Sequence, residues 1–219
     1  MRSPDIMPNA TASQRQFHER GFVITGPLFE TAQLQALCAV LPERANAGTR
    51  KMLDEPLIRE TVTALRAQPQ LAPLIANRVA VQCIYFHKDQ ATNWSVRLHR
   101  DSAFPMTGDG PWPAAGVKEG QTYRRVPHEF ARRLCAIRLH LDGAPEGDLT
   151  VLAGSHRESM LVRSTAKHRC DVQRGAALVL TPALLHGSAK LDTSPSRRVL
   201  HFVFAPRELP YAYSWYDPV

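Results

Sequence analysis

The sequence predicts an α+β fold, in which helices in the first third of the chain support a β-sandwich or jelly roll formed by the rest. Apolar residues recur at helical spacing before residue 78, and short runs rich in β-branched and aromatic residues follow Val79. The chain has 219 residues, 44% of them hydrophobic, which suits one domain with one sizeable core. We therefore expect a single domain over residues 1–219, with residues 1–78 as mainly helical support and residues 79–205 as the jelly-roll core.

The helical part begins with residues 14–19, a helix that Gly21 stops and that a short strand ending at Ile24 follows. A second helix is expected over residues 31–41, where Leu34, Leu37, Cys38 and Leu41 have i, i+3, i+4, i+7 spacing. A third helical stretch covers residues 56–75 and is interrupted near Pro69 and Pro73.

Strands are expected over residues 81–88, 94–99, 134–141, 148–152, 176–181 and 198–204. Residues 143–147 form a turn between two of them. Residues 102–126 contain four glycines, three prolines and little periodicity, so we expect a long loop there. Long loops in compact domains often act as lids or binding loops.

The composition favours a protein of a reducing, cytoplasmic compartment. The four cysteines form no CxxC pair, no run approaches the roughly 18 apolar residues of a membrane span, and residues 1–14 have no apolar signal-peptide core. The net charge of +7 is compatible with an anionic partner. Because Lys and Arg are spread along the chain and no aromatic-basic ladder occurs, a solvated basic surface without nucleic acid is the preferred interpretation.

His99-Arg100-Asp101 is a candidate metal-binding unit. Residues two apart at the end of a strand point to the same face, so an imidazole and a carboxylate meet there. His186, which follows the strand ending near Thr181, would complete a set of two His and one carboxylate, which leaves open positions on Fe(II). The H-x-D pattern alone is common, and a lone His is more often a surface or satisfied core residue.

Arg197 adds weight to this set because it lies eleven residues beyond His186, just ahead of a strand. An Arg buried beside a metal is costly unless it meets an anion. A dicarboxylate is such an anion, since a guanidinium grips a carboxylate in a bidentate fork.

With these motifs the sequence resembles the phytanoyl-CoA dioxygenase family, in particular its ectoine-hydroxylase-like branch. The resemblance covers roughly residues 15–205 and rests on His99-x-Asp101, the stretch GDLTVLAGSH at 147–156, His186-Gly187-Ser188 and Arg197. Residues 17–23 are also similar to the opening of the family. The chain departs from the family at Arg100, where Gln is frequent, and in lacking a tryptophan close behind Asp101.

The resemblance implies a double-stranded β-helix that holds Fe(II) on His99, Asp101 and His186. It also implies that Arg197, Lys88 and Ser188 bind the co-substrate 2-oxoglutarate, which is decarboxylated with O₂ while a C–H bond is hydroxylated. A carboxylate at position 101 argues for hydroxylation, because related halogenases have a small residue there. Gln82 lies where related enzymes contact their substrate, and it is in phase with Lys88 on one strand face.

Two further cations are candidate substrate ligands. Arg97 is in phase with His99 and Asp101, and Arg138 alternates with an apolar set that would pack on the helices. A rim salt bridge for Arg97 and an exposed Arg138 are the alternatives. We expect a small polar substrate, such as an amino acid or a natural-product intermediate, and a monomer or homodimer.

Two other functional classes stay open. A nucleic-acid repair oxygenase would use the basic surface, but such enzymes carry an Arg-x-Asn-type ending that is absent after His186. A catalytically silent jelly-roll binding domain would keep the fold, although it has no need for three metal ligands and an anion-binding Arg.

Overall fold

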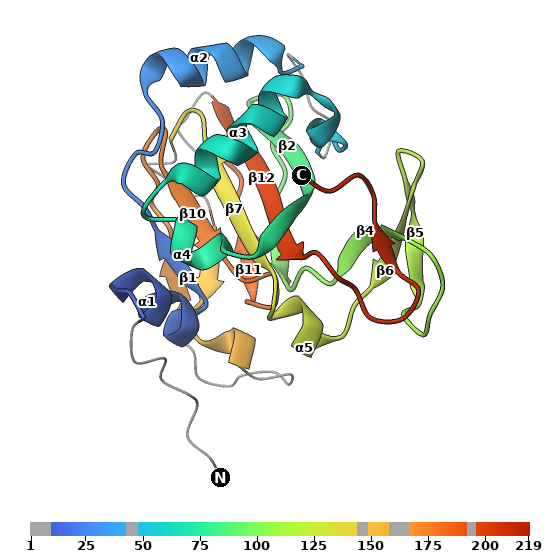
Figure 1. The fold of residues 1–219 in the computed structure, drawn as a ribbon. Helices are drawn as coiled ribbons and strands as arrows, with labels where there is room; N and C mark the ends of the chain where they lie inside the picture. Colours follow the sequence, from blue (N-terminus) through green and yellow to red (C-terminus); the bar gives the residue numbers. More distant parts are fainter. Residues whose placement is uncertain (1–9, 43–47, 144–148, 158–166, 192–195) are drawn as a thin grey trace.

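The computed structural model describes residues 10–42, 48–143, 149–157, 167–191 and 196–219. Its centre is a five-stranded antiparallel sheet in the order β1-β10-β7-β12-β2. The strands are β1 (Phe22–Ile24), β2 (Arg78–Asp89), β7 (Cys135–His140), β10 (Ala177–Leu180) and β12 (Ser196–Pro206). The long pair of β2 and β12 forms one side of this sheet, and β7 joins β12 to the shorter strands (Figure 1).

Helices cover one face of this sheet. Figure 1 shows α3 (Pro56–Ala67) and α4 (Ala72–Ile75) lying over the sheet, and α2 (Thr31–Val40) next to them at the upper end of the strands. The buried residues of α3 are Ile58, Thr61, Val62 and Leu65, a helical stripe that packs against alternate residues of the sheet such as Ile137 and Phe202. The opposite face of the sheet is thereby left for other contacts.

A second antiparallel sheet, of order β3-β11-β8-β9, packs on that opposite face. It consists of β3 (Val96–His99), β8 (Thr150–Leu152), β9 (Lys167–Arg169) and β11 (His186–Ser188). Val151 of β8 shares a buried apolar cluster with Ala136 and Leu178 of the large sheet. The two sheets form a jelly-roll-like sandwich, in agreement with the sequence-based expectation.

The expectation of a long irregular loop over residues 102–126 is wrong. The segment forms β4 (Ala103–Thr107), β5 (Ala114–Lys118) and β6 (Gln121–Arg125), which make a third sheet with β13 (Ser214–Trp215). Pro105 and the glycines hide the strand pattern, and β4 finds its partner β13 far away in sequence. Trp112 stacks on Tyr213 with ring centroids 5.0 Å apart and so anchors this sheet.

The predicted helices are confirmed, with small shifts at their ends. The first is α1 (Ala12–Arg20), which ends at Gly21 with a φ of 82°. Three short helices, not predicted, are η1 (Met52–Asp54), α5 (His128–Ala131) and η2 (Ser155–Arg157). The predicted turn at 143–147 lies, from residue 144 on, outside the described residues. Among the described residues, no helix has the length and apolar character needed to cross a bilayer.

Asp142 fastens the end of β7 to β12. Its carboxylate accepts hydrogen bonds from the backbone N–H, Nε and Nη2 of Arg198, at 2.9, 2.9 and 2.6 Å. Burial raises the pKa of Asp142, but these hydrogen bonds outweigh it and hold the pKa below its ordinary value.

We expect Asp142→Asn to lower the free energy of unfolding by about 1–2 kcal/mol at neutral pH, because it weakens a charge-assisted contact between two core strands. A lowered folded-state pKa means that the stabilisation is complete above the ordinary value of 3.8 and is lost as pH falls below it. Urea unfolding at pH 7 and pH 3 measures both effects. Asp109→Asn is the matched control, since Asp109 pairs with Arg124 at 3.6 Å but is fully exposed. An equal loss for both variants at pH 7 would contradict the assignment.

Candidate metal centre

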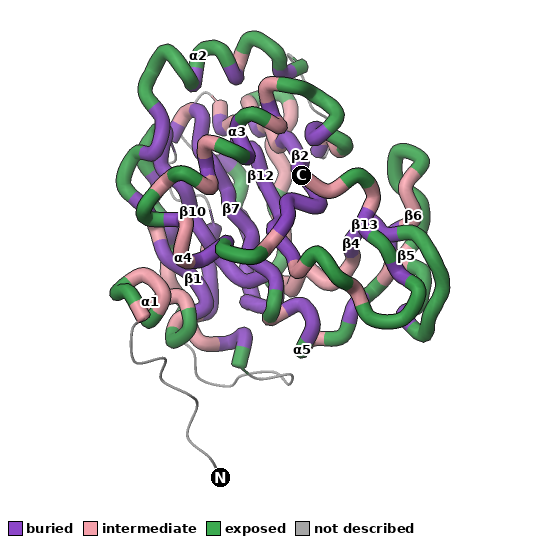
Figure 2. The backbone as a smooth tube through the Cα atoms, in the orientation of Figure 1, coloured by how far each residue is buried: buried purple, intermediate pink, exposed green. Residues whose placement is uncertain are grey.

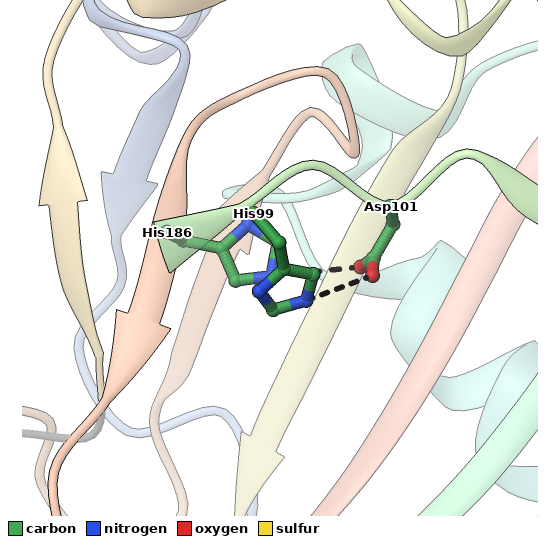
Figure 3. A group of neighbouring side chains, drawn as sticks. All are labelled: His99, Asp101 and His186. Atoms are coloured by element: carbon green, nitrogen blue, oxygen red, sulfur yellow. Dashed lines mark ion pairs between the residues drawn. The ribbon is translucent and has the colours of Figure 1, made fainter. Parts of the chain in front are cut away.

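The edge of the second sheet brings three potential metal ligands together. In the β3–β11 pair, His99 lies directly opposite His186. Asp101 follows β3, and its backbone N–H donates to the Pro182 carbonyl at 3.0 Å, which turns the carboxylate back toward both imidazoles. Asp101 Oδ1 lies 3.4 Å from His99 Nε2, and Oδ2 lies 3.6 Å from His186 Nε2 (Figure 3). All three ligand atoms lie within 4.8 Å of one another.

Backbone carbonyls hold both imidazoles in the orientation that a metal requires. His99 Nδ1 lies 2.9 Å from the Arg97 carbonyl, and His186 Nδ1 lies 2.9 Å from the Leu184 carbonyl. A carbonyl only accepts, so each Nδ1 carries the proton and each Nε2 presents its lone pair to the common point. The residues present therefore fit a divalent metal ion with two imidazoles and one carboxylate as ligands.

The electrostatics of the centre suit a cation. Burial raises the pKa of Asp101, but the imidazoles of His186 and His99 outweigh it and hold that pKa below its ordinary value. Burial lowers the pKa of His186, and a hydrogen bond to Asp101 raises the pKa of His99. At neutral pH, Asp101 is ionised and His186 is neutral, and these are the forms that bind metal.

Arg100, between the two ligands of the H-x-D unit, ties the centre to the segments around it. Its Nε donates to the Ala183 carbonyl at 2.9 Å, and its Nη2 donates to the Ser155 carbonyl at 3.0 Å. The Ser155 hydroxyl in turn accepts the backbone N–H of Leu185 at 2.9 Å. Arg100 thus connects the segment that carries His99 and Asp101 to the segment that leads into His186.

A cavity of about 260 Å³ opens beside the three ligands, between the two main sheets. Alternate residues of β12 line it, namely Arg197, Val199, His201 and Val203. Their register partners on the adjacent strand β2, the alternate residues from Gln82 to Lys88, line it beside them. At one end Lys88 Nζ donates to the Ser188 hydroxyl at 2.9 Å and to the Ala189 carbonyl at 3.0 Å, and Arg197 pairs with Lys88 in the strand register. This end can hold a carboxylate.

The other candidate residues divide into two groups. Gln82 and Arg138 are buried and line the cavity, and Arg138 Nη1 lies 3.5 Å from His201 Nδ1. Arg97 is exposed and is not among the described residues that line the cavity. The register of β3 against β11 shifts between His99 and Val96, and this bulge breaks the alternation on which the in-phase argument for Arg97 depends.

Sequence reasoning missed several lining residues. His201 could have been found, because it continues the alternation that begins at Arg197. Arg50 and Lys118 carry no local signal, since tertiary contacts alone bring them to the cavity. Two aromatics of residues 102–126, which the sequence suggests as lid or loop-anchoring side chains, differ in position: Tyr123 lines the cavity, whereas Trp112 packs against Phe130 of α5 and against Tyr213.

No protein-family model and no curated protein matches the sequence. Solved structures do match the fold. HygX from Streptomyces hygroscopicus, determined with nickel and 2-oxoglutarate bound, is 14% identical at a TM-score of 0.61, over 90% of this chain and 87% of that one. SnoN, a non-haem α-ketoglutarate-dependent epimerase from nogalamycin biosynthesis, is 13% identical at a TM-score of 0.66, over 88% and 81%. AviO1 from Streptomyces viridochromogenes Tue57 is 20% identical at 0.59, over 92% and 96%. These similarities show a shared fold.

We expect Arg100→Ala to weaken the binding of Ni(II) roughly tenfold, because supporting residues of a metal site typically contribute that much to metal affinity. Isothermal titration with Ni(II) measures the effect, and thermal unfolding of the metal-free variant shows whether the fold is intact. Arg132→Ala is the control, since Arg132 is a half-buried arginine that pairs with Glu129. If both variants bind Ni(II) as the unaltered protein does, Arg100 does not position the ligands.

Proposed function

We propose that this chain is a non-haem Fe(II)- and 2-oxoglutarate-dependent dioxygenase that hydroxylates a small molecule. One observation supports it above all: the three converging ligands and the Lys88–Ser188–Arg197 cluster line the same cavity. Two imidazoles and one carboxylate leave open coordination positions that a bidentate co-substrate can fill, and a dicarboxylate has a second anionic end for the cation cluster.

In this proposal His99, Asp101 and His186 hold the iron, and Arg197, Lys88 and Ser188 bind the distal carboxylate of 2-oxoglutarate. With O₂, the bound iron and 2-oxoglutarate supply the oxidising power that breaks an unactivated C–H bond, and 2-oxoglutarate becomes succinate and CO₂. The chain itself orients both ends of the co-substrate and excludes water from the target carbon.

The cation cluster is suited to fixing that orientation. Lys88 and Arg197 are 4% and 6% exposed, so a carboxylate between them meets little competing water. Trp94, 5.0 Å from Lys88 Nζ to its ring centroid, shields the same end of the cavity. A fixed distal carboxylate sets the position of the rest of the molecule relative to the three ligands.

The finer assignments rest on the sequence motifs. The H-x-D unit, the distal His and the offset of Arg197 support a double-stranded β-helix of the phytanoyl-CoA dioxygenase type, and the positions of Lys88 and Gln82 support the ectoine-hydroxylase-like branch. Gln82 and Arg138 are proposed substrate ligands because they line the cavity. The presence of Asp101 favours hydroxylation, although SnoN is described as an epimerase. The described lining of the cavity gives no reason to prefer nucleic acid over a small molecule.

We expect the purified protein to form succinate from 2-oxoglutarate when Fe(II) and O₂ are present, and His99→Ala to abolish both this turnover and tight Ni(II) binding. Arg197→Gln should raise the KM for 2-oxoglutarate roughly 10- to 100-fold, because it removes a charge-assisted hydrogen bond from a buried carboxylate. Succinate detection and Ni(II) titration measure these effects. Arg207→Gln is the control, because Arg207 is an exposed residue just past the end of β12. Turnover or Ni(II) binding by His99→Ala at the level of the unaltered protein would refute the proposal.

A further inference from the structure

The cavity has two polar ends, and the co-substrate accounts for only one. Gln82 and Lys88 both line it from β2, six residues apart. At about 3.3 Å per residue, these positions lie roughly 20 Å apart along the strand. Ile84 and Phe86 line the stretch between them. A five-carbon dicarboxylate held at Lys88 is much too short to reach the groups around Gln82, so that end is left for the substrate.

Arg50 lines the cavity because the backbone of residues 48–50 lies close against β2. Thr49 forms an isolated antiparallel bridge with Tyr85, which lays the segment along β2. Gly48 has a φ of +113°, and a Cβ there would lie 2.8 Å from the Phe86 ring. Only glycine allows both this conformation and this contact. The Arg50 Nη1 donates to the Gly48 carbonyl at 3.1 Å, whereas its buried Nε has no hydrogen-bond partner among the described residues.

The β5–β6 hairpin supplies the other polar groups at this end. Tyr123 of β6 is buried, and its hydroxyl accepts a hydrogen bond from Gln82 Nε2 at 3.1 Å. Lys118, the last residue of β5, is exposed, lines the cavity, and has its Nζ 5.0 Å from the centroid of the Tyr123 ring. Figure 2 shows the tip of this hairpin as an exposed projection at the edge of the molecule. The second polar end is therefore open to solvent.

Positive charge exceeds negative charge at this end. Arg50 and Lys118 line it, and the nearest carboxylate in the described part of the chain is Glu119, whose Oε1 lies 3.9 Å from Arg50 Nη1. The same oxygen accepts the Arg50 backbone N–H at 3.2 Å. The lining includes one carboxylate within the described ranges, Asp101, which belongs to the metal centre. Within the described ranges, Glu119 pairs with Arg50 and no carboxylate forms an ion pair with Lys118.

We propose, building on the function proposed above, that the substrate has an apolar body and one anionic end, a carboxylate or a phosphate ester, bound by Arg50, Lys118 and Tyr123. The apolar walls formed by Ile84, Phe86, Phe104 and Val203 suit such a body between this end and the metal. Glu119 occupies the position beside Arg50 that the substrate anion approaches, so it repels the anion and competes with it.

The test uses the protein loaded with Ni(II) and 2-oxoglutarate, and three probes with the same apolar body: phenylacetate, benzyl phosphate and the neutral phenylacetamide. Isothermal titration at low and high salt gives their affinities. We expect the better of the two anions to bind at least tenfold more tightly than the amide, and this preference to shrink at high salt. The comparison of the two anions separates a carboxylate site from a phosphate site.

Single substitutions show which side chains bind the anionic group of the probe. Arg50→Gln and Lys118→Gln should each reduce the preference for the anion roughly three- to tenfold, whereas Glu119→Gln should strengthen anion binding a few-fold. The gain expected for Glu119→Gln cannot arise from misfolding. Lys51→Gln is the matched control, because Lys51 is an exposed neighbour of Arg50 that pairs with Asp54 at 3.5 Å.

Equal affinities of the anions and the amide for the unaltered protein would overturn the inference, as would a preference that survives in the Arg50→Gln, Lys118→Gln double variant. Either result leaves the proposed function standing as long as Ni(II) and 2-oxoglutarate bind normally. Failure of the unaltered protein to bind Ni(II) and 2-oxoglutarate would instead refute the proposed function.

Discussion

The pairing of β3 with β11 is the constraint on which the rest of the site depends. It sets His99 opposite His186, and the hydrogen bond from Asp101 to the Pro182 carbonyl returns the carboxylate to the same point after the strand has ended. Ser188, two residues past His186, then reaches Lys88 on the opposite sheet. One register therefore positions the three proposed metal ligands and part of the proposed anion site, and a slip of one residue would turn His99 away from its partner.

The two faces of the large sheet differ in composition: one packs against the helices, and the other lines the cavity. The face under the helices is apolar and fully buried, with residues such as Ile137, Leu200 and Phe202. Burial of this apolar surface drives folding. It offsets the desolvation free energy that the buried charges of Lys88 and Arg197 on the inner face cost. The core that stabilises the domain and the charges that equip the cavity thus lie on opposite sides of the same strands.

The sequence predicted the parts of the structure that follow local periodicity. Alternation along β2 and β12 places Lys88 and Arg197 on the cavity side, as expected. Where local pattern and tertiary structure diverge, prediction failed. The bulge in β3 takes Arg97 off the cavity lining. Strands β4, β5 and β6 pair with one another, and β4 also pairs with β13 near the C-terminus, which local pattern does not reveal. Arg50 reaches the cavity only because Gly48 lets its segment lie against β2, which no periodicity reveals.

The third sheet packs against one end of the sandwich, where Phe104 and Trp112 share an apolar cluster with Val79 and Val203. It has its own aromatic anchor, in which Trp112 stacks on Tyr213, and the tip of its hairpin is solvent-exposed around Val117 and Glu119. Exposed hairpin tips accept substitutions and insertions at little thermodynamic expense. Substitutions in this hairpin can therefore change the entrance of the cavity while His99, Asp101 and His186 keep their positions on another sheet.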